Sequence, residues 1–292
     1  MSVITPESGL RKFLAASARA EFHRCFTCGS CAAECPVNAK TGALSPLALV
    51  RLAAFGLLEE ALAAPEIWRC LQCRKCAHVC PMRVKPVTLI RFLRWEAVRQ
   101  SPERAERGAK ALGLQREFHR VRWHAVRAVF SGAPAPDPAR QWDRLAATPV
   151  SGMAPEAAAE VGGNGARAAV RKAAEVALGR KTHVAACFTC EECRNACPAA
   201  CERAVFDPVT LFRLANLGLR DEVLGSPALW LCIQCESCTQ ACGQGVVGHL
   251  VIRGLRAAAE AGGFAPPGRL RAWQEADGAV FRALVERIDA VF

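Results

Sequence analysis

Sixteen of the seventeen cysteines in this 292-residue chain lie in four short motifs that share one spacing. In each motif, three cysteines stand two residues apart and a fourth follows after three more. The motifs read CFTCGSCAAECP, CLQCRKCAHVCP, CFTCEECRNACP and CIQCESCTQACG, beginning at Cys25, Cys70, Cys187 and Cys232. Three closely spaced thiolates on a curling loop can reach three corners of one cube. The spacing C-x2-C-x2-C-x3-C-P therefore predicts [4Fe–4S] clusters.

The fourth cysteine of each motif is expected to bind a neighbouring cluster, as the last cysteine of such a run does in two-cluster ferredoxins. The proline after it fixes φ and helps to turn the chain. This crossed arrangement predicts four ligand sets: Cys25, Cys28, Cys31 and Cys80; Cys70, Cys73, Cys76 and Cys35; Cys187, Cys190, Cys193 and Cys242; and Cys232, Cys235, Cys238 and Cys197. The last motif has Gly243 in place of the proline, and we expect Cys242 to remain a ligand in a less rigid loop.

Structural zinc is the alternative use of so many cysteines. Zinc sites usually pair two C-x2-C hooks across a longer loop, with four ligands for one ion. Three cysteines at two-residue gaps, repeated four times, favour iron–sulfur clusters instead. Cys201 lies outside the motifs and has no counterpart in the first half, where Ala39 stands. We interpret it as a spare thiol, an alternative ligand or redox-active thiol being the other readings.

The chain is an internal repeat with an offset of 162 residues, because every motif cysteine of the first half has a partner that far downstream. The segment AVF that ends at residue 130 also returns as the last three residues of the chain. Residues 1–130 and 163–292 are therefore expected to form two units. Residues 131–162, rich in Pro, Ala and Gly, are predicted to be a surface linker, mostly without regular structure. Trp142 and Leu145 could still pack it against the units.

The sequence between the two motifs of each unit is typical of helices. In SPLALVRLAAFG, Ser45 is the expected N-cap, Pro46 the first helical residue and Gly56 the end. DPVTLFRLANLG repeats this design, with Asp207 as the cap. LLEEALAA, TLIRFLRWEAVRQ and HLVIRGLRAAAEA are also predicted to be helical. No alternating strand pattern of any length is present, so we expect an all-α fold with cluster-binding loops.

Several residues beside the motifs could influence a cluster. Trp68 and Trp230 stand two positions before a motif cysteine, and we interpret them as hydrophobic covers that shield a cluster from water, an electron conduit being the alternative. Arg69, Arg74 and Lys75 surround the second motif, where positive charge would raise a cluster's potential or attract an acidic partner. The matching positions of the second half are not basic, so the two units are expected to differ in potential or partner.

Composition argues against several other functions. Sixteen thiolates contribute −16 and four oxidised cores about +8, which brings the formal charge of +11 to about +3, so we expect no nucleic-acid binding. The N-terminus lacks an export signal, and no stretch of about 18 apolar residues is uninterrupted. We therefore expect a cytoplasmic protein without a transmembrane segment. No nucleotide-binding loop and no cluster of catalytic side chains is visible, so we expect no catalytic residue.

The motifs and the helical segment between them resemble the iron–sulfur C subunit of heterodisulfide reductase over roughly residues 20–100 and 182–260. The pattern S/D-P…R-L…G-L…E…L…P-x-x-W-x-C is carried in the first unit by Ser45, Pro46, Arg51, Leu52, Gly56, Leu57, Glu60, Leu62, Pro65 and Trp68, and in the second by Asp207, Pro208, Arg213, Leu214, Gly218, Leu219, Glu222, Leu224, Pro227 and Trp230. The resemblance implies an α-helical ferredoxin fold with two [4Fe–4S] clusters in each unit, four in the chain. It also implies electron transfer between the flavin-bearing A subunit of such a complex and its catalytic or electron-accepting B subunit.

Two features depart from that family. Its typical member has one such unit where this chain has two, and the CC motif of the B subunit is absent, so disulfide chemistry is not assigned to this chain. We expect an electron-transfer subunit of a heterodisulfide-reductase-like complex, with a flavoprotein and a CC-motif protein as partners. The alternatives are the iron–sulfur subunit of a quinone-linked dehydrogenase, of the succinate, glycolate or glycerol-phosphate type, and a scaffold whose clusters only hold the fold.

Overall fold

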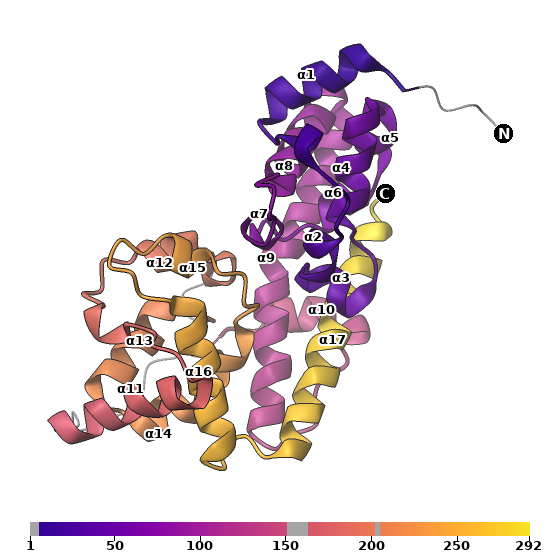
Figure 1. The fold of residues 1–292 in the computed structure, drawn as a ribbon. Helices are drawn as coiled ribbons and strands as arrows, with labels where there is room; N and C mark the ends of the chain where they lie inside the picture. The colour runs from indigo at the N-terminus through magenta and orange to yellow at the C-terminus, as the bar shows by residue number, and fades with distance from the viewer. Residues whose placement is uncertain (1–5, 151–162, 202–204) are drawn as a thin grey trace. The chain divides into compact units, whose positions relative to one another are not determined.

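The structure, a computed structural model, describes residues 6–150, 163–201 and 205–292 (Figure 1). All regular elements in these ranges are helices, so the all-α prediction is confirmed for them. No helix of the described residues is both long enough and apolar enough to cross a membrane. The side chain of Cys201 and the linker residues 151–162 lie outside the described residues.

The described residues of the first half form ten α-helices and one short 3-10 helix. Their bounds are α1 Ser8–Ala18, η1 Phe22–Arg24, α2 Ser30–Ala33, α3 Pro36–Thr41, α4 Pro46–Phe55, α5 Leu58–Ala63, α6 Glu66–Arg69, α7 Lys75–His78, α8 Pro86–Gln100, α9 Pro102–Phe130 and α10 Pro138–Ala147. The second half repeats most of this order as α11 Asn164–Leu178, η2 Val184–Ala186, α12 Glu192–Ala196, η3 Pro198–Cys201, α13 Pro208–Leu217, α14 Arg220–Leu224, η4 Pro227–Leu231, α15 Ser237–Gln240, α16 Gly248–Ala261 and α17 Pro267–Asp289.

The helix between the two motifs of each unit begins and ends where the sequence predicts. The Ser45 hydroxyl accepts a hydrogen bond from the Ala48 N–H at 3.2 Å, and α4 ends before Gly56, whose φ is 75°. In α13 the Asp207 carboxylate accepts from the Val209 N–H at 3.0 Å. These caps satisfy N–H groups that a helix leaves without partners at its first turn, and the glycine adopts the left-handed conformation that other residues avoid.

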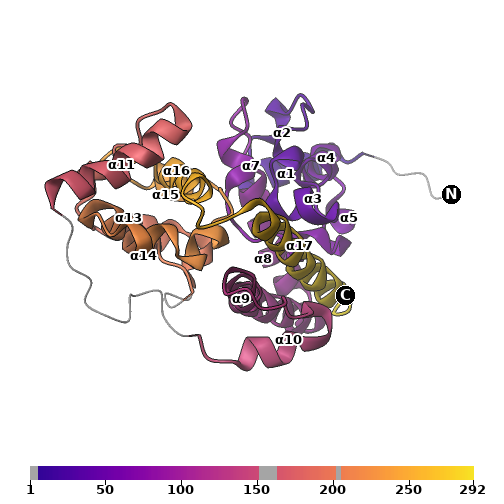
Figure 2. The same ribbon diagram turned by 90° about the horizontal axis from the view of Figure 1, so that it is seen from below.

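Buried apolar faces pack these helices together within each unit. In unit 1, defined below, α4 packs against both α1 and α8, and Leu49, Leu89 and Ile90 are buried. In unit 2, α11 lies along α16 and also packs against α13 (Figure 2). Its core includes Leu255 and Phe212. The removal of this apolar surface from water stabilises the helices that carry the cysteine loops.

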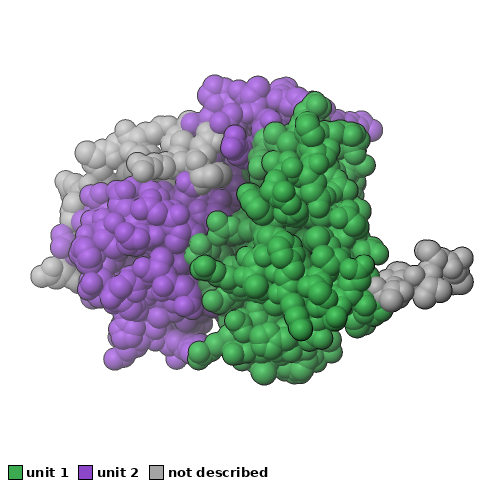
Figure 3. Space-filling model, turned by 90° about the horizontal axis from the view of Figure 1, so that it is seen from above, with its two compact units in different colours: residues 1–115, 281–292 green, residues 116–280 purple. Residues whose placement is uncertain are grey.

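The compact units do not coincide with the sequence repeats at their ends. Unit 1 consists of residues 1–115 and 281–292, and unit 2 of residues 116–280 (Figure 3). Helix α9 therefore contributes its first half to unit 1 and its second half to unit 2. Helix α17 begins in unit 2 and ends in unit 1. Each unit thus contains the C-terminal end of the other repeat.

Matched aromatic contacts hold these C-terminal ends, which we call the exchanged ends. In unit 1 the ring of Phe292 stacks on Trp68, with centroids 5.4 Å apart and planes inclined by 12°. In unit 2 the ring of Phe130 stacks on Trp230 at 5.0 Å and 20°. The two phenylalanines end the repeated AVF segments, and each covers the tryptophan of the other repeat.

Part of the predicted linker is helical. Helix α10 begins with Pro138 after the cap Asp137, whose carboxylate accepts from the Ala139 N–H at 3.0 Å. The Trp142 side chain is buried, and its Nε1 donates to Glu117 at 2.6 Å within unit 2. This segment differs from the expected irregular linker because it combines a helix cap with an amphipathic pattern that buries one face.

Candidate metal centres

The sixteen motif cysteines line four hollows in the described part of the chain, two in each unit. We call them the outer and inner hollows. The outer hollow of unit 1 is lined by Cys25, Cys28, Cys31 and Cys80, and its inner hollow by Cys35, Cys70, Cys73 and Cys76. In unit 2 the outer hollow is lined by Cys187, Cys190, Cys193, Cys238 and Cys242, and the inner hollow by Cys197, Cys232, Cys235 and Cys238. These groups match the crossed sets, with Cys238 bordering both hollows of unit 2.

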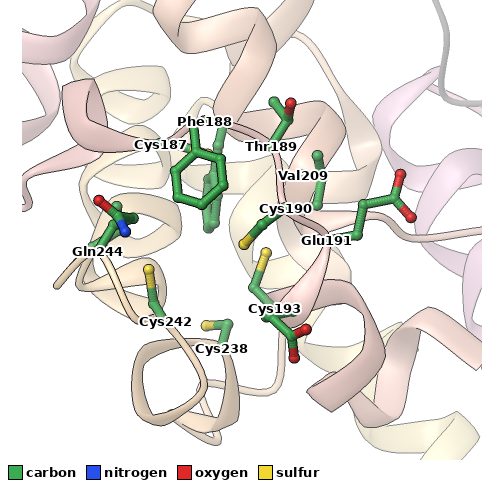
Figure 4. Close-up of a pocket in the computed structure, with 13 residues that line it drawn as sticks. Cys187, Phe188, Thr189, Cys190, Glu191, Cys193, Val209, Cys238, Cys242 and Gln244 are labelled. Atoms are coloured by element: carbon green, nitrogen blue, oxygen red, sulfur yellow. The ribbon is translucent and has the colours of Figure 1, made fainter.

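The outer hollow of unit 2 shows how distant loops bring thiols together (Figure 4). The sulfur atoms of Cys190, Cys193, Cys238 and Cys242 gather around one space, and the ring of Phe188 lies beside it. The hollow has about 380 Å³ of empty space, open solvent included, and the other three have about 340 to 350 Å³. Two motifs separated in the sequence therefore build each site together.

The same backbone feature curls all four motifs. The second residue after the first cysteine and the fourth residue after it have positive φ angles in every motif: Thr27 (60°) and Gly29 (80°), Gln72 (58°) and Arg74 (63°), Thr189 (63°) and Glu191 (69°), and Gln234 (54°) and Glu236 (69°). Seven of these eight residues are not glycine, and the left-handed conformation costs such residues energy. Strain at the same two positions in four loops indicates that the loops are held for a site.

The two kinds of hollow differ in their access to solvent. Cys28 and Cys190, which line the outer hollows, are exposed. Their neighbours Phe26 and Phe188 are 57% and 61% exposed. The cysteines of the inner hollow of unit 1 are all buried: Cys35, Cys70, Cys73 and Cys76. The outer hollow is therefore the surface-facing site of each unit.

The thiols of the outer hollows affect one another's protonation. Burial, together with the nearby Cys25, Cys80 and Cys28, raises the pKa of Cys31 to about 11. Cys80 belongs to the other motif, so its influence follows from the crossed grouping. At Cys28, which is exposed, a hydrogen bond with the Ser30 hydroxyl at 3.4 Å lowers the pKa.

The inner hollows show the same crossing between motifs. Burial raises the pKa of Cys76, and the nearby Cys70 and Cys35 raise it further. In unit 2, burial and then the thiols of Cys235, Cys232 and Cys238 raise the pKa of Cys197. Thiols crowded in an apolar hollow hold their protons unless a cation is present to release them.

These donor sets fit iron–sulfur clusters. None of the sixteen described cysteine side chains is in a disulfide. No three His, Cys, Asp or Glu side chains in the described ranges converge closely enough to hold a single metal ion. Four thiols spread around a hollow suit a multinuclear cluster, which occupies more space than one zinc ion.

Trp68 and Trp230 do not line the hollows, contrary to their interpretation as covers over a cluster. Both are buried, and each stacks on a phenylalanine of an exchanged helix end. A Cβ atom at Gly108 of α9 would lie 2.5 Å from the Trp68 ring, so glycine is required for this close approach. The tryptophans therefore pack the start of the second motif of each unit against the neighbouring helices.

The three basic residues around the second motif of unit 1 take different positions. Arg74 lines the inner hollow. Lys75 forms an ion pair with Glu34 at 2.9 Å, and Arg69 forms one with Asp289 at 2.7 Å. Only Arg74 is therefore placed to act directly on a group bound in the hollow, as the sequence analysis expects.

A buried ion pair beside the second motif of unit 2 was not expected from the sequence. Arg122 Nε donates to the Asp277 carboxylate at 2.7 Å, and both side chains are 1% exposed. Arg122 Nη1 also donates to the carbonyl of Leu231, the residue before Cys232. The repeat offset of 162 residues could have indicated this pair. At that offset Arg122 corresponds to Leu284 and Asp277 to Gln115, and both of these residues are uncharged.

Comparison with known proteins finds similarity over part of the chain. Residues 21–84, which include both motifs of the first half, match the 4Fe-4S dicluster domain. Over 81 residues the chain is 37% identical to the C subunit of the H(2):CoB-CoM heterodisulfide,ferredoxin reductase of Methanothermobacter thermautotrophicus, a match that covers 28% of this chain and 43% of that protein. Over 63 residues it is 38% identical to the iron-sulfur C subunit of the CoB--CoM heterodisulfide reductase of Methanopyrus kandleri, covering 22% and 32%.

A third relative matches a similar share of the chain. A protein of Archaeoglobus profundus that is named as similar to the C subunit of heterodisulfide reductase is 33% identical over 94 residues, which cover 26% of this chain and half of that protein. The chain spans less than half the length of the first relatives it matches. No solved structure is significantly similar to it. The chain therefore contains a match to the 4Fe-4S dicluster domain over residues 21–84 and is distantly homologous to the C subunits of heterodisulfide reductases.

Proposed function

We propose that this chain is an electron-transfer subunit that holds four [4Fe–4S] clusters, one in each hollow, and relays electrons for a heterodisulfide-reductase-like complex. The observation that carries this proposal is the grouping of the cysteines. The thiols that line each hollow come from both motifs of a unit, as crossed ligation requires. The dicluster match over residues 21–84 supports two clusters in the first unit, and the repeat extends the inference to the second.

The residues of the chain would have distinct tasks. A bound [4Fe–4S] cluster supplies one-electron chemistry. The sixteen cysteines would hold the clusters, and the left-handed residues of each motif would aim the thiols. The apolar lining would exclude water, and the exposed Phe26 and Phe188 would offer contact surfaces beside the outer hollows, where a partner can approach. No residue is assigned a catalytic role.

The partners we propose are a flavoprotein that resembles the A subunit of heterodisulfide reductase and a CC-motif protein that resembles its B subunit. Support comes from the relatives described above, which are named as subunits of heterodisulfide reductases. The duplication would give one chain two outer sites, one for each partner. A cytoplasmic location stays a prediction.

Anaerobic purification of the tagged chain from its own cells tests this proposal. We expect a flavoprotein and a CC-motif protein to co-purify, and the reduced flavoprotein to bleach the visible absorbance of the chain. A quinone-linked dehydrogenase subunit would instead co-purify with a membrane-bound quinone reductase. Clusters that no physiological donor reduces would favour the scaffold interpretation and overturn the proposed relay.

A further inference from the structure

Two arginines outside the cysteine motifs occupy matched places beside the inner hollows. Arg94 lies on α8 and Arg256 on α16, and the repeat offset of 162 residues relates them. Arg94 is buried and Arg256 is partly buried. Each repeat also has an exposed arginine three positions earlier on the same helix, Arg91 and Arg253. Arg94 and Arg256 thus have a matched exposed pair, Arg91 and Arg253, for comparison.

Both guanidinium groups bind the backbone at the start of the second motif. Arg94 Nη2 donates to the carbonyl of Cys70 at 2.5 Å, and Arg256 Nη2 donates to the carbonyl of Cys232 at 2.8 Å. Their Nε atoms donate to the carbonyl three residues before each cysteine, at 2.5 and 2.7 Å. Each guanidinium group therefore binds the backbone of a cysteine whose thiol lines the inner hollow.

The tryptophan that precedes the second motif of each unit lies against the arginine's guanidinium group. The Arg94 guanidinium carbon is 5.5 Å from the ring centroid of Trp68, and that of Arg256 is 5.4 Å from the ring centroid of Trp230. Neither arginine forms an ion pair with a carboxylate of the described residues. Burial lowers the pKa of both arginines, while the thiols of Cys70 and Cys232 act in the opposite direction. At Arg256 the more distant carboxylates of Asp277 and Glu260 also raise the pKa.

A buried cation without a carboxylate partner is costly unless other negative charge offsets it. A thiolate-bound [4Fe–4S] cluster carries net negative charge, and it gains one more negative charge on reduction. A fixed cation nearby stabilises the reduced form more than the oxidised form, because Coulomb attraction grows with the charge and is weakly screened in a buried site. The expected consequence is a higher reduction potential.

We propose that Arg94 and Arg256 raise the reduction potentials of the clusters in the two inner hollows. This inference rests on the proposed function, because it requires that the inner hollows hold clusters. The arginines are positioning residues that do not bind the cluster. Uptake of one electron from the reductant adds one negative charge to the inner cluster and breaks no bond, so the guanidinium contributes only through its field and its hold on the loop. The matched geometry in both repeats carries the inference.

A redox titration of the full chain with dithionite, followed by electron paramagnetic resonance, tests this role. In Arg94→Gln we expect the midpoint of one cluster of unit 1 to move to lower potential, with iron content unchanged and the clusters of unit 2 unaffected. Arg256→Gln should do the same in unit 2. Arg91→Gln and Arg253→Gln should leave all midpoints at the native values. Equal shifts in the buried and exposed variants would overturn the proposal, as would an unchanged midpoint in Arg94→Gln.

The variant Arg94→Lys separates charge from hydrogen bonding. Lysine retains the positive charge but not the planar group that binds two carbonyls. We expect it to keep the native midpoint more closely than glutamine does. If Arg94→Gln loses its iron, the lysine variant decides: retained iron with a near-native midpoint supports the electrostatic role, and lost iron contradicts it. Iron content of the native chain, measured separately, shows whether the proposed clusters themselves exist.

Discussion

Units 1 and 2 group their cysteines in the same way but surround them with different charges. Three exposed basic residues near the outer hollow of unit 1 have uncharged counterparts in unit 2: Arg24 and Ala186, Arg83 and Gly245, and Lys85 and Val247. Conversely, two uncharged residues of unit 1, Gly29 and Ser30, correspond to acidic residues in unit 2. These are Glu191 and Glu192, which line its outer hollow. Constant ligands indicate one kind of cofactor. Opposite charges indicate that the two outer hollows suit different partners or different potentials.

The difference extends into the core behind the second motif. Unit 2 places the buried pair Arg122 and Asp277 there, whereas unit 1 has Leu284 and Gln115 at the matched positions. The Gln115 side chain donates to the Cys70 carbonyl at 3.2 Å. One unit thus supports its motif with a neutral amide and the other with an ion pair. Four sets of variants test how far this likeness and this difference extend.

The largest effect is expected from the fourth cysteine of the second motif in each unit. We expect Cys80→Ala and Cys242→Ala each to lose about four iron atoms per chain, because each removes a ligand of one cluster. Under crossed ligation, Cys80→Ala should abolish the same paramagnetic signal as Cys25→Ala. If Cys80→Ala instead abolishes the signal that Cys73→Ala abolishes, the ligation is not crossed. Cys201→Ala is the control and should keep all the iron.

The second effect concerns the ion pair that distinguishes unit 2. We expect Arg122→Leu to destabilise this unit by roughly 3–5 kcal/mol, because the buried Asp277 carboxylate loses its ion pair with Arg122. The double variant Arg122→Leu with Asp277→Gln reproduces the residues of unit 1 and should recover much of this loss. Hydrogen exchange of the peptide 222–237 reports the local free energy of opening. A double variant no more stable than the single one would contradict the comparison.

The third effect depends on pH and on a histidine that unit 1 lacks. His119 is buried in unit 2, and burial, aided by the nearby Arg122, lowers its pKa to about 3, while Phe281 stands at the matched position. The unfolded chain binds a proton near pH 6.5 and the folded unit does not. The free energy of unfolding is therefore not reduced by His119 above that pH. It falls as the pH decreases toward 3, by about 2 kcal/mol between pH 7 and pH 5.

The variant His119→Phe checks the origin of this acid sensitivity. Hydrogen exchange at pH 7 and pH 5 should show a smaller loss of protection in unit 2 of the variant than in the native chain. Unit 1 serves as the internal reference in the same sample. An equal loss in the native chain and the variant would show that another group causes it.

The smallest effect tests the exchange of helix ends. We expect Phe292→Leu to weaken protection around Trp68 and Phe130→Leu to weaken it around Trp230, each by about 1 kcal/mol, because the ring stacking is lost while most apolar contact remains. Hydrogen exchange of peptides from the two halves separates the outcomes. If each substitution instead affected the tryptophan of its own repeat, the ends would not be exchanged.

The sequence allowed much of this structure to be predicted because its signals are local. The cap Ser45, the helix end Gly56 and the motif spacing act over a few residues, and the helices they predict are present. The exchanged ends could not be predicted, because Phe130 and Phe292 end identical AVF segments and either could cover either tryptophan. Arg94 is one of many arginines on predicted helices, and only the three-dimensional structure brings it to the Cys70 carbonyl.

The iron and acid-labile sulfide content of the anaerobically purified chain decides whether the four hollows hold four [4Fe–4S] clusters. Four hollows lined by crossed thiols should hold about 16 iron and 16 sulfide per chain, with an interaction between the two reduced clusters of each unit visible by electron paramagnetic resonance. About eight iron atoms would mean that two of the four hollows hold no cluster, in contradiction to the proposed four-cluster relay. Zinc without sulfide would overturn the account.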